Sequence, residues 1–345
     1  MEKDLQEQLE ITLYQEECLW FQKSRSQWIA DGDRNTKYYH SKTIIRRRKN
    51  KKISLRNNDG NWVNEPENLK CLVRQFYVDL FTEDILDRDH VVAWNTYPNS
   101  FENQHERLSA PIHFFECKKA LFEMGPHKAP GEDGYSALFF QQCWDTVSNS
   151  IFHYVNQVWV NPSLISFINN TLIVMIPKID KPEFVSQFRP ISLCNVIYKI
   201  ISKVIGNRIK PSLNAIISPY QSSFIPGRSI HHNIIVAHEM VHSMAKMKGK
   251  KMFMSIKIDL EKAYDRLNWN FIEHCLEDCK FPPKLIQVIH HCISSPSYKI
   301  MWNGEKTDSF TPSRGIRQGD PLSPYLFVIC MDRLSHIIAD QVEAE

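Results

Sequence analysis

The sequence predicts an α+β protein in which a few short strands are separated by many helices. Several long segments place apolar residues at helical spacing, whereas short apolar runs such as 172–176 and 252–258 end at turn-forming or acidic residues, as buried strands do. The chain has 345 residues, of which 43% are hydrophobic and 23% charged. Such a chain can form a large core and is expected to contain two or three subdomains.

The composition also excludes some classes of protein. No run approaches the roughly 20 apolar residues that a membrane helix needs, and the first ten residues lack the pattern of a signal peptide. The nine cysteines are scattered, which is typical of reduced thiols inside a cell. We therefore expect an intracellular location, in the nucleus or the cytoplasm, and no membrane partner.

Charge is distributed unevenly along the chain. Residues 1–22 contain six acids and one base, and residues 23–56 contain twelve bases and two acids, while the remaining residues have a net charge of −2. The densest part of the basic segment is a block of six cations: Arg46, Arg47, Arg48, Lys49, Lys51 and Lys52. A basic block predicts contact with a polyanion or a nuclear address. From charge alone, a solvated charged tail is an equal alternative.

The N-terminal half is expected to be mostly helical. Residues 2–22 and 69–81 have helical apolar spacing, and Asn64 and Pro66 supply a start signal for the second. A turn at 57–60, after an arginine-rich ribbon, predicts a small hairpin. Residues 83–106 are polar and predict a linker, and 128–134 predict a loop because of their proline and glycines. Further helices are expected over 111–125, 136–143 and 147–160.

The C-terminal half combines the predicted strands with further helices. The apolar run at 172–176 predicts a strand, and Phe188–Pro190 predict a break in regular secondary structure. Residues 218–227 predict a loop, and 298–302 a strand that turns at Asn303–Gly304 and returns near 308–312. Apolar periodicity predicts helices over 196–210, 231–248, 269–279, 283–293 and 322–339.

Asp259 is the most informative candidate for chemistry. It follows the apolar run at 252–258, so we expect its carboxylate to be held at the edge of a sheet. Such a carboxylate, with the backbone carbonyl of Leu260, suits Mg²⁺, which prefers oxygen ligands. Tyr264 follows five residues later and is expected to line the same pocket. The alternative is an aspartate that caps the next helix.

Three further sites carry polar groups of the right type. The turn 317–324, with the sequence RQGDPLSP, offers amides and the Gln318 side chain to a nucleotide. Lys178 and Arg189 each lie beside a proline and can bind phosphate, Arg through a fork of donors and Lys as a point charge. Each of these features alone is usual for a surface loop.

The order of these motifs resembles the reverse transcriptase of LINE-type (non-LTR) retrotransposons, especially those of plants. The matching stretches are KAPGEDG at 128–134, LIVMIPK at 172–178, FRPISL at 188–193, YQSSFIPGRSI at 220–230, IKIDLEKAYDRLNW at 256–269 and RGIRQGDPLSPYLF at 314–327. Residues 20–40 also look like the segment that these proteins carry between endonuclease and polymerase. The resemblance therefore extends over nearly the whole chain.

The resemblance implies the fingers and palm of a right-hand polymerase that copies RNA into DNA with two Mg²⁺ ions. It implies that Asp259 binds both ions and that Tyr264 blocks a ribose 2′-OH. Gln318 and Gly319 would touch the incoming dNTP and the template. Lys178 and Arg189 would hold the triphosphate, whereas Asp265 has a structural role. The implied partners are an RNA template, a DNA primer and dNTPs; the oligomeric state is not implied.

One family motif is not found. The palm of the family needs a second carboxylate motif with two adjacent aspartates after the Gln318 helix, and this sequence contains no Asp-Asp dipeptide. We therefore expect a truncated polymerase that is inactive alone. The expected domains are an N-terminal helix and basic arm (1–60), a helix and linker (61–108), and fingers with a partial palm (109–345, core motifs 172–330). The alternatives are a non-enzymatic RNA- or DNA-binding remnant of a retrotransposon polyprotein and a decayed product that folds poorly.

Overall fold

The computed structural model describes residues 2–24, 36–51, 53–83, 102–247 and 254–343. The chain divides into two compact units, residues 1–69 with 303–305, and residues 70–302 with 306–345. Among the described residues, no helix is both long enough and apolar enough to cross a membrane.

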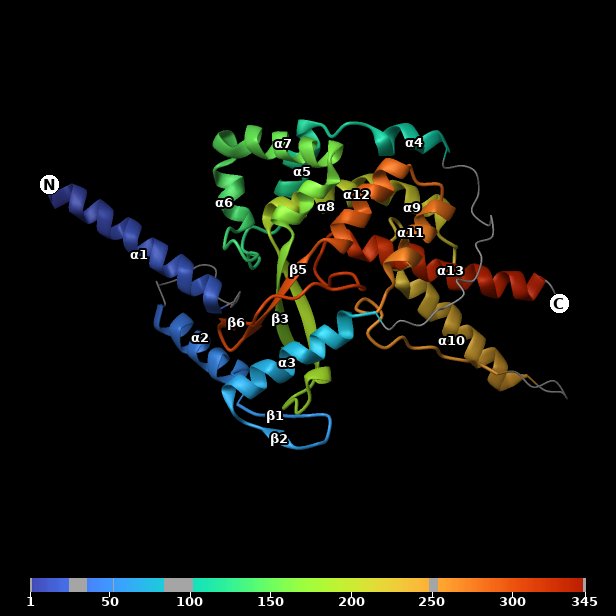
Figure 1. Ribbon diagram of the computed structural model, residues 1–345, viewed down its shortest axis with the longest axis horizontal. Coiled ribbons are helices and arrows are strands. Elements are labelled where there is room, and N and C mark those ends of the chain that lie inside the picture. Colours follow the sequence, from blue (N-terminus) through green and yellow to red (C-terminus); the bar gives the residue numbers. More distant parts are fainter. Residues whose placement is uncertain (1, 25–35, 52, 84–101, 248–253, 344–345) are drawn as a thin grey trace. The chain divides into compact units, whose positions relative to one another are not determined.

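The first unit consists of two helices and a hairpin. Its helices are α1 (Glu2–Ser24) and α2 (Thr36–Asn50), which pack together through ring contact between Trp20 and His40 (Figure 1). The prediction of a helix over 2–22 is confirmed. The prediction of an arginine-rich ribbon is wrong, because Arg46, Arg47 and Arg48 lie in α2. Lys and Arg have high helix propensity, and no proline or glycine interrupts the segment.

The predicted hairpin is confirmed, as two short strands on either side of the turn at 57–60. Strands β1 (Leu55–Arg56) and β2 (Trp62–Val63) pair antiparallel. The turn between them depends on Asn57, whose Oδ1 accepts hydrogen bonds from the backbone N–H groups of Asp59 (3.1 Å) and Asn61 (2.9 Å). An asparagine that bonds its own backbone in this way stabilises tight turns.

Helices make up most of the second unit. They are α3 (Pro66–Phe81, which begins in the first unit), α4 (Glu102–Ser109), α5 (Phe114–Phe122), α6 (Ala137–Gln142), α7 (Trp144–Val160), α8 (Val196–Ile209), α9 (Leu213–Ile216), α10 (Ile230–Lys246), α11 (Trp269–Asp278), α12 (Pro283–Ser294) and α13 (Ser323–Glu343). Each predicted helix of this region is found. Helix α4 is a correction, because its first part lies in the predicted linker 83–106; the rest of that linker lies outside the described residues, apart from Glu83.

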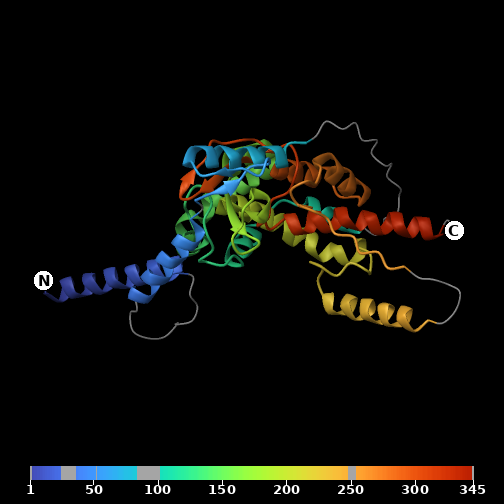
Figure 2. The same cartoon turned by 90° about the horizontal axis from the view of Figure 1, so that it is seen from below.

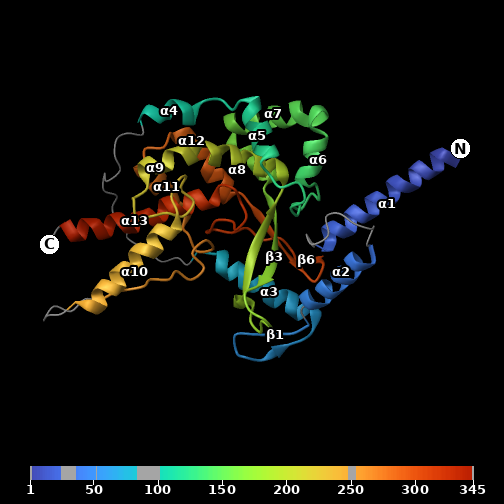
Figure 3. The same cartoon turned by 180° about the vertical axis from the view of Figure 1, so that it is seen from behind.

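The sheet has the strand order β4-β3-β5-β6, built from β3 (Asn170–Pro177), β4 (Phe188–Cys194), β5 (Ser297–Trp302) and β6 (Glu305–Lys306). Strand β3 pairs antiparallel with β4 and parallel with β5. The predicted strands at 172–176 and 298–302 are confirmed, and so is the return pairing, through a bridge between Tyr298 and Phe310. Residues 70–81 of α3 lie in front of β3 in Figure 1 and behind it in Figure 3.

Two sequence predictions about strands are wrong. Phe188–Pro190 are not a break but the start of β4. Because β4 is an edge strand, the missing N–H of Pro190 removes no bond from the ladder. Conversely, the described part of the run 252–258 has no regular structure, and Met254, Ile256 and Ile258 are exposed. An apolar run shows only that its side chains favour a strand. To form a strand, the backbone also needs a second backbone segment to pair with.

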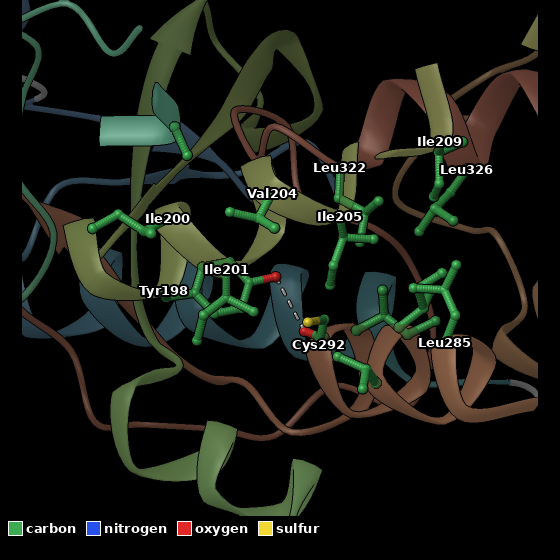
Figure 4. Packing of buried hydrophobic residues seen from close by; sticks show 14 of the residues in the cluster. Tyr198, Ile200, Ile201, Val204, Ile205, Ile209, Leu285, Cys292, Leu322 and Leu326 are labelled. Carbon is green, nitrogen blue, oxygen red and sulfur yellow. Dashed lines mark hydrogen bonds between the residues drawn. The ribbon is translucent and has the colours of Figure 1, made fainter. Parts of the chain in front are cut away.

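The core of the second unit is centred on α8. The side chains of Ile200, Ile201, Val204 and Ile205 are almost fully buried among residues from neighbouring helices, including α12 (Figure 4). The hydroxyl oxygen of Tyr198 lies 3.5 Å from the backbone carbonyl oxygen of Cys292, the contact dashed in Figure 4. In contrast, α10 has no buried residue and stands away from this core in Figure 2.

Candidate functional site

The turn before α13 is anchored by a buried polar network. Arg317 donates from Nη2 to Asp320 Oδ2 (3.0 Å) and to the Cys292 carbonyl (2.9 Å), and from Nη1 to Thr171 Oγ1 (3.1 Å). The Tyr198 hydroxyl donates to the same Asp320 oxygen at 2.6 Å, and its ring lies under the guanidinium, 4.1 Å from Cζ to the ring centre. The buried charge pair is thereby satisfied on several sides, which a buried pair needs in order to be stable.

Two glycines let the same turn approach its neighbours closely. Gly315 (φ +91°) and Gly319 (φ +117°) adopt a backbone conformation that L-residues with side chains disfavour. A Cβ atom on Gly315 would lie 2.6 Å from the carbonyl oxygen of Asp265, and one on Gly319 would lie 2.9 Å from that of Ser192. Both positions therefore require glycine for space as well as for conformation.

Backbone hydrogen bonds connect this turn to two other segments. Ser192 on β4 donates its N–H to the Gln318 carbonyl at 2.8 Å. Gly315 donates to the Leu267 carbonyl at 2.7 Å, and Ile316 to the Tyr264 carbonyl at 2.8 Å. The turn is therefore held between β4 and the segment 264–267. These three parts of the chain come from three separate motifs of the sequence.

Asp265 fixes the side chain of Gln318. Its side chain is buried, at 3% exposure for the residue, and its Oδ1 accepts a hydrogen bond from Gln318 Nε2 at 3.0 Å. Burial raises the pKa of the Asp265 carboxyl to about 6, against the opposing effects of the Gln318 hydrogen bond and of the charges on Lys178, Lys262 and Arg266. The structural role expected for Asp265 is therefore specific: it orients Gln318.

Tyr264 lies directly beside this pair. Its ring is half-buried and stacks on Phe327 of α13, with 4.6 Å between ring centres and 23° between planes. Burial raises the pKa of its hydroxyl. That Tyr264 forms the wall of a nucleotide pocket stays a prediction.

Arg189 lies on β4, and Lys178 directly follows the last residue of the adjacent strand β3. Arg189 pairs across the ladder with Ile176, and the Lys178 N–H extends the ladder to the Gln187 carbonyl at 2.8 Å. Both side chains are exposed, and Lys178 Nζ donates to the Ser186 carbonyl at 3.2 Å. Two exposed cations thus lie at this end of the sheet, whose edge strand also carries Ser192. The positive charge of Lys178 favours the ionised form of the Asp265 carboxyl.

Asp259 is not where the sequence predicts it. Both Asp259 and Leu260 are exposed and lie on a segment without regular structure, so the predicted sheet-edge position is wrong. No group of three or more His, Cys, Asp or Glu side chains suited to a metal ion occurs within the described parts of the chain. This arrangement does not fit a two-ion site, and the Mg²⁺ ions stay a prediction.

The residues that hold the turn were overlooked by the sequence analysis. Arg317 and Asp320 are spaced i, i+3 within a turn rich in glycine and proline, and such a spacing can bring the two charges together. Thr171 and Ser192, in contrast, are ordinary strand residues. Nothing in their local sequence signals the contacts that they make with residues more than a hundred positions away.

The basic block lies at the end of α2. Arg46 is half-buried, whereas Arg47, Arg48 and Lys51 are exposed. Lys52 and the side chain of Lys49 lie outside the described residues. Nucleic-acid binding by this block stays a prediction.

Residues 176–344 match a family model described as reverse transcriptase (RNA-dependent DNA polymerase). This range includes Lys178, strand β4 with Arg189, the segment 259–265 and the turn at 314–322. The family match and the contacts between these segments therefore concern the same part of the chain.

Three curated relatives extend the comparison. The chain is 29% identical over 315 residues to the "Transposon TX1 uncharacterized 149 kDa protein" of Xenopus laevis, covering 90% of this chain and 24% of that protein. It is 24% identical over 348 residues to the "RNA-directed DNA polymerase from mobile element jockey" of Drosophila melanogaster (92% and 35%). It is 25% identical over 217 residues to the "Retrovirus-related Pol polyprotein from type-2 retrotransposable element R2DM" of the same fly (63% and 20%).

The chain thus spans between a fifth and about a third of the length of these relatives. The plant-like character and the truncation expected from the sequence stay predictions. The match of the family model and the transposon relatives agree with the resemblance read from the motifs. Residues 176–344 of this chain therefore match the reverse transcriptase family, and the relatives that the chain resembles are proteins of transposons and retrotransposable elements.

Proposed function

We propose that residues 109–345 form the fingers and part of the palm of an RNA-directed DNA polymerase and bind an incoming dNTP. The family match over 176–344 and the clustering of three motifs around Gln318 support this proposal. An RNA template and a DNA primer are the proposed partners.

The proposed nucleotide contacts follow from the chemistry of the side chains. Lys178 and Arg189 supply two exposed cations to the triphosphate, Arg189 as a planar fork and Lys178 as a point charge. Gln318 and Gly319 present an amide side chain and a backbone N–H to the base and sugar. Tyr264 restricts the space beside the ribose, so that a 2′-OH is disfavoured.

The observation that carries the proposal is the pair of hydrogen bonds at Gln318. Its backbone carbonyl accepts from Ser192 of β4, and its side chain donates to the buried Asp265. A residue that is fixed through both its backbone and its side chain binds a ligand with less loss of conformational entropy than a mobile residue does. Among the residues that the structure describes, the surroundings of Asp259 do not fit an ion site.

The test is equilibrium binding of a fluorescent dNTP to the full chain. We expect the K178A/R189A variant to lose roughly tenfold or more in affinity, since charge-assisted hydrogen bonds contribute about 1.5–3 kcal/mol each. K210A removes another exposed lysine and is the matched control. Y264A should reduce the preference for dNTP over NTP. Unchanged affinity in K178A/R189A together with an unchanged preference in Y264A would contradict the proposal.

A second candidate function rests on a different observation. Helix α2 contains no acid and carries four of the six cations of the basic block, which favours binding of RNA or DNA without catalysis. We expect micromolar RNA binding that weakens steeply with salt. Neutralising the six cations of the basic block should reduce the slope of log K against log salt by up to about 4. An unchanged affinity and slope would exclude this function.

A further inference from the structure

The solvent-facing side of α5 carries an unusual set of residues. At 100° per residue, five of its side chains fall within an arc of about 140°: Phe114, Phe115, Lys118, Lys119 and Phe122. All five are exposed, and the three phenylalanines retain 38%, 69% and 49% of their accessible surface. Exposed aromatic rings on a soluble helix mark an interaction surface when they gather in one place.

Two of these rings are held rigidly from below. Phe114 lies 5.5 Å from the buried Trp144 and 5.5 Å from Phe152, between ring centres, and Phe122 lies 6.1 Å from Trp144. The opposite side of α5 is fully buried through Cys117, Ala120 and Leu121, which pack in the core with α8. Two of the three rings of this aromatic platform are therefore fixed in position, and the third, Phe115, is the most exposed.

The charge of this surface is positive. The two acids of α5 and of its C-terminal cap are engaged elsewhere: Glu116 makes two 2.7 Å bonds to Arg208, and Glu123 lies 3.0 Å from Lys203 Nζ. Lys118 and Lys119 remain on the exposed arc, and Lys118 Nζ lies 5.8 Å from the Phe122 ring centre. The platform thus presents rings and cations side by side, with both acids neutralised by partners.

We propose that the α5 surface, defined as Phe114, Phe115, Lys118, Lys119 and Phe122, binds single-stranded nucleic acid. Unpaired bases stack on aromatic rings, and lysines contact the phosphates between them. The eight residue steps from Phe114 to Phe122 span about 12 Å, which accommodates roughly three base steps at about 3.4 Å each. The proposal requires no catalysis and involves neither the nucleotide contacts around Gln318 nor the basic block of α2.

The affinity test uses the full chain with labelled U12 and dT12 oligonucleotides and with a 12-base-pair duplex, measured by fluorescence anisotropy. Phe115 is the best position to change, because it is the most exposed of the three rings. We expect F115A to weaken binding of both single strands by roughly fivefold or more and to leave duplex binding unchanged. F167A, which removes a ring that is 76% exposed outside this surface, should change affinity less than twofold.

The charge test separates the lysines from the rings. K118Q/K119Q should reduce the slope of log K against log salt by roughly 1.4, as expected for two contacts to a single strand. K210Q/K246Q removes two other exposed lysines and should leave the slope unchanged. If F115A and K118Q/K119Q both leave the affinity and the slope unaltered, or if F115A weakens duplex binding equally, the proposal is wrong.

Crosslinking assigns the binding to a place on the chain. With 4-thiouridine in U12, ultraviolet irradiation and mass spectrometry of the digested protein should identify adducts within residues 114–122, also when the six cations of the basic block are neutralised. Adducts confined to residues 36–52 would overturn the proposal and would leave the second candidate function standing.

Discussion

The turn at 314–322 and the segment 254–260 were both singled out by the sequence and differ completely in the structure. Both carry motifs of the reverse transcriptase family. The turn is closed by a buried Arg317–Asp320 pair and by backbone bonds to β4 and to residues 264–267. The segment with Asp259 is exposed and has no regular structure. A motif whose polar groups find buried partners is fixed in place, whereas a strand motif is fixed only when another strand pairs with it.

The largest effect is expected for R317M, which tests the anchoring of the turn. The variant leaves Asp320 buried without its cation, and such a broken pair typically costs about 3–5 kcal/mol. Urea unfolding followed by circular dichroism measures the free energy. The matched control is R189M, an exposed arginine for which a change below about 0.5 kcal/mol is expected. A loss below 1 kcal/mol in R317M would show that the network does not hold the turn.

The next effect concerns the close approach at Gly315. In G315A, a Cβ would lie 2.6 Å from the Asp265 carbonyl oxygen, at a φ of +91°. G227A is the matched control, because Gly227 also has positive φ (+76°) but no atom within 4 Å of the added Cβ. The conformational strain, about 1 kcal/mol, is common to both variants. We expect G315A to lose roughly 1–3 kcal/mol more than G227A in urea unfolding; equal losses would contradict the structure.

A smaller effect is expected from the charge of Asp265. Its folded pKa is raised from 3.8 to about 6, so the folded protein holds this proton more tightly than the unfolded chain does. Stability should therefore fall as the pH rises from about 4 to about 6, by at most about 3 kcal/mol. D265N retains an oxygen that accepts from Gln318 Nε2 and should remove this dependence.

The control for this pH dependence is D265A, which removes the acceptor as well as the charge. It should flatten the same pH window, and in addition it should weaken dNTP binding because Gln318 loses its orientation. D265N should bind dNTP more tightly than D265A. If both variants keep the slope of the parent chain between pH 4 and 6, another group titrates there and the raised pKa is wrongly assigned.

Helix positions and the sheet's central strands were predictable from local pattern. The spacing of apolar residues in segments such as 196–210 and 283–293 identifies the helix face that packs in the core. The bounds predicted for α8 and α12 therefore agree with the structure within a few residues. The strand β4 was missed because Pro190 normally ends a regular element. Only its place at the sheet edge, which depends on residues far away in the chain, makes it compatible with a strand.

The candidate site was predictable in its residue types but not in its arrangement. Gln318, Gly319, Lys178 and Arg189 were identified by motif, and the structure brings Gln318 against Asp265 and β4. The anchoring partners Thr171 and Ser192 carry no motif of their own, since a hydroxyl or an N–H on a strand is common. Position in three dimensions, and not residue type, gives them their role, and a single sequence does not contain that information.

The smallest effect is expected for D259A. Because Asp259 is exposed on a segment without regular structure, its truncation should change the free energy of unfolding by no more than about 0.5 kcal/mol. The comparison with R317M then measures how differently the two motifs are held. A loss of 2 kcal/mol or more would mean that Asp259 has buried partners and that the segment is ordered in solution.

Primer extension completes the test of Asp259. On poly(rA)/oligo(dT) with Mg²⁺, we expect little incorporation by this chain, because Asp259 is exposed on a segment without regular structure and is not held in a fixed position. Incorporation that D259A abolishes would contradict this expectation. It would also show that the segment 254–260 takes up a fixed position when primer, template and nucleotide are bound, as the turn at 314–322 already does without them.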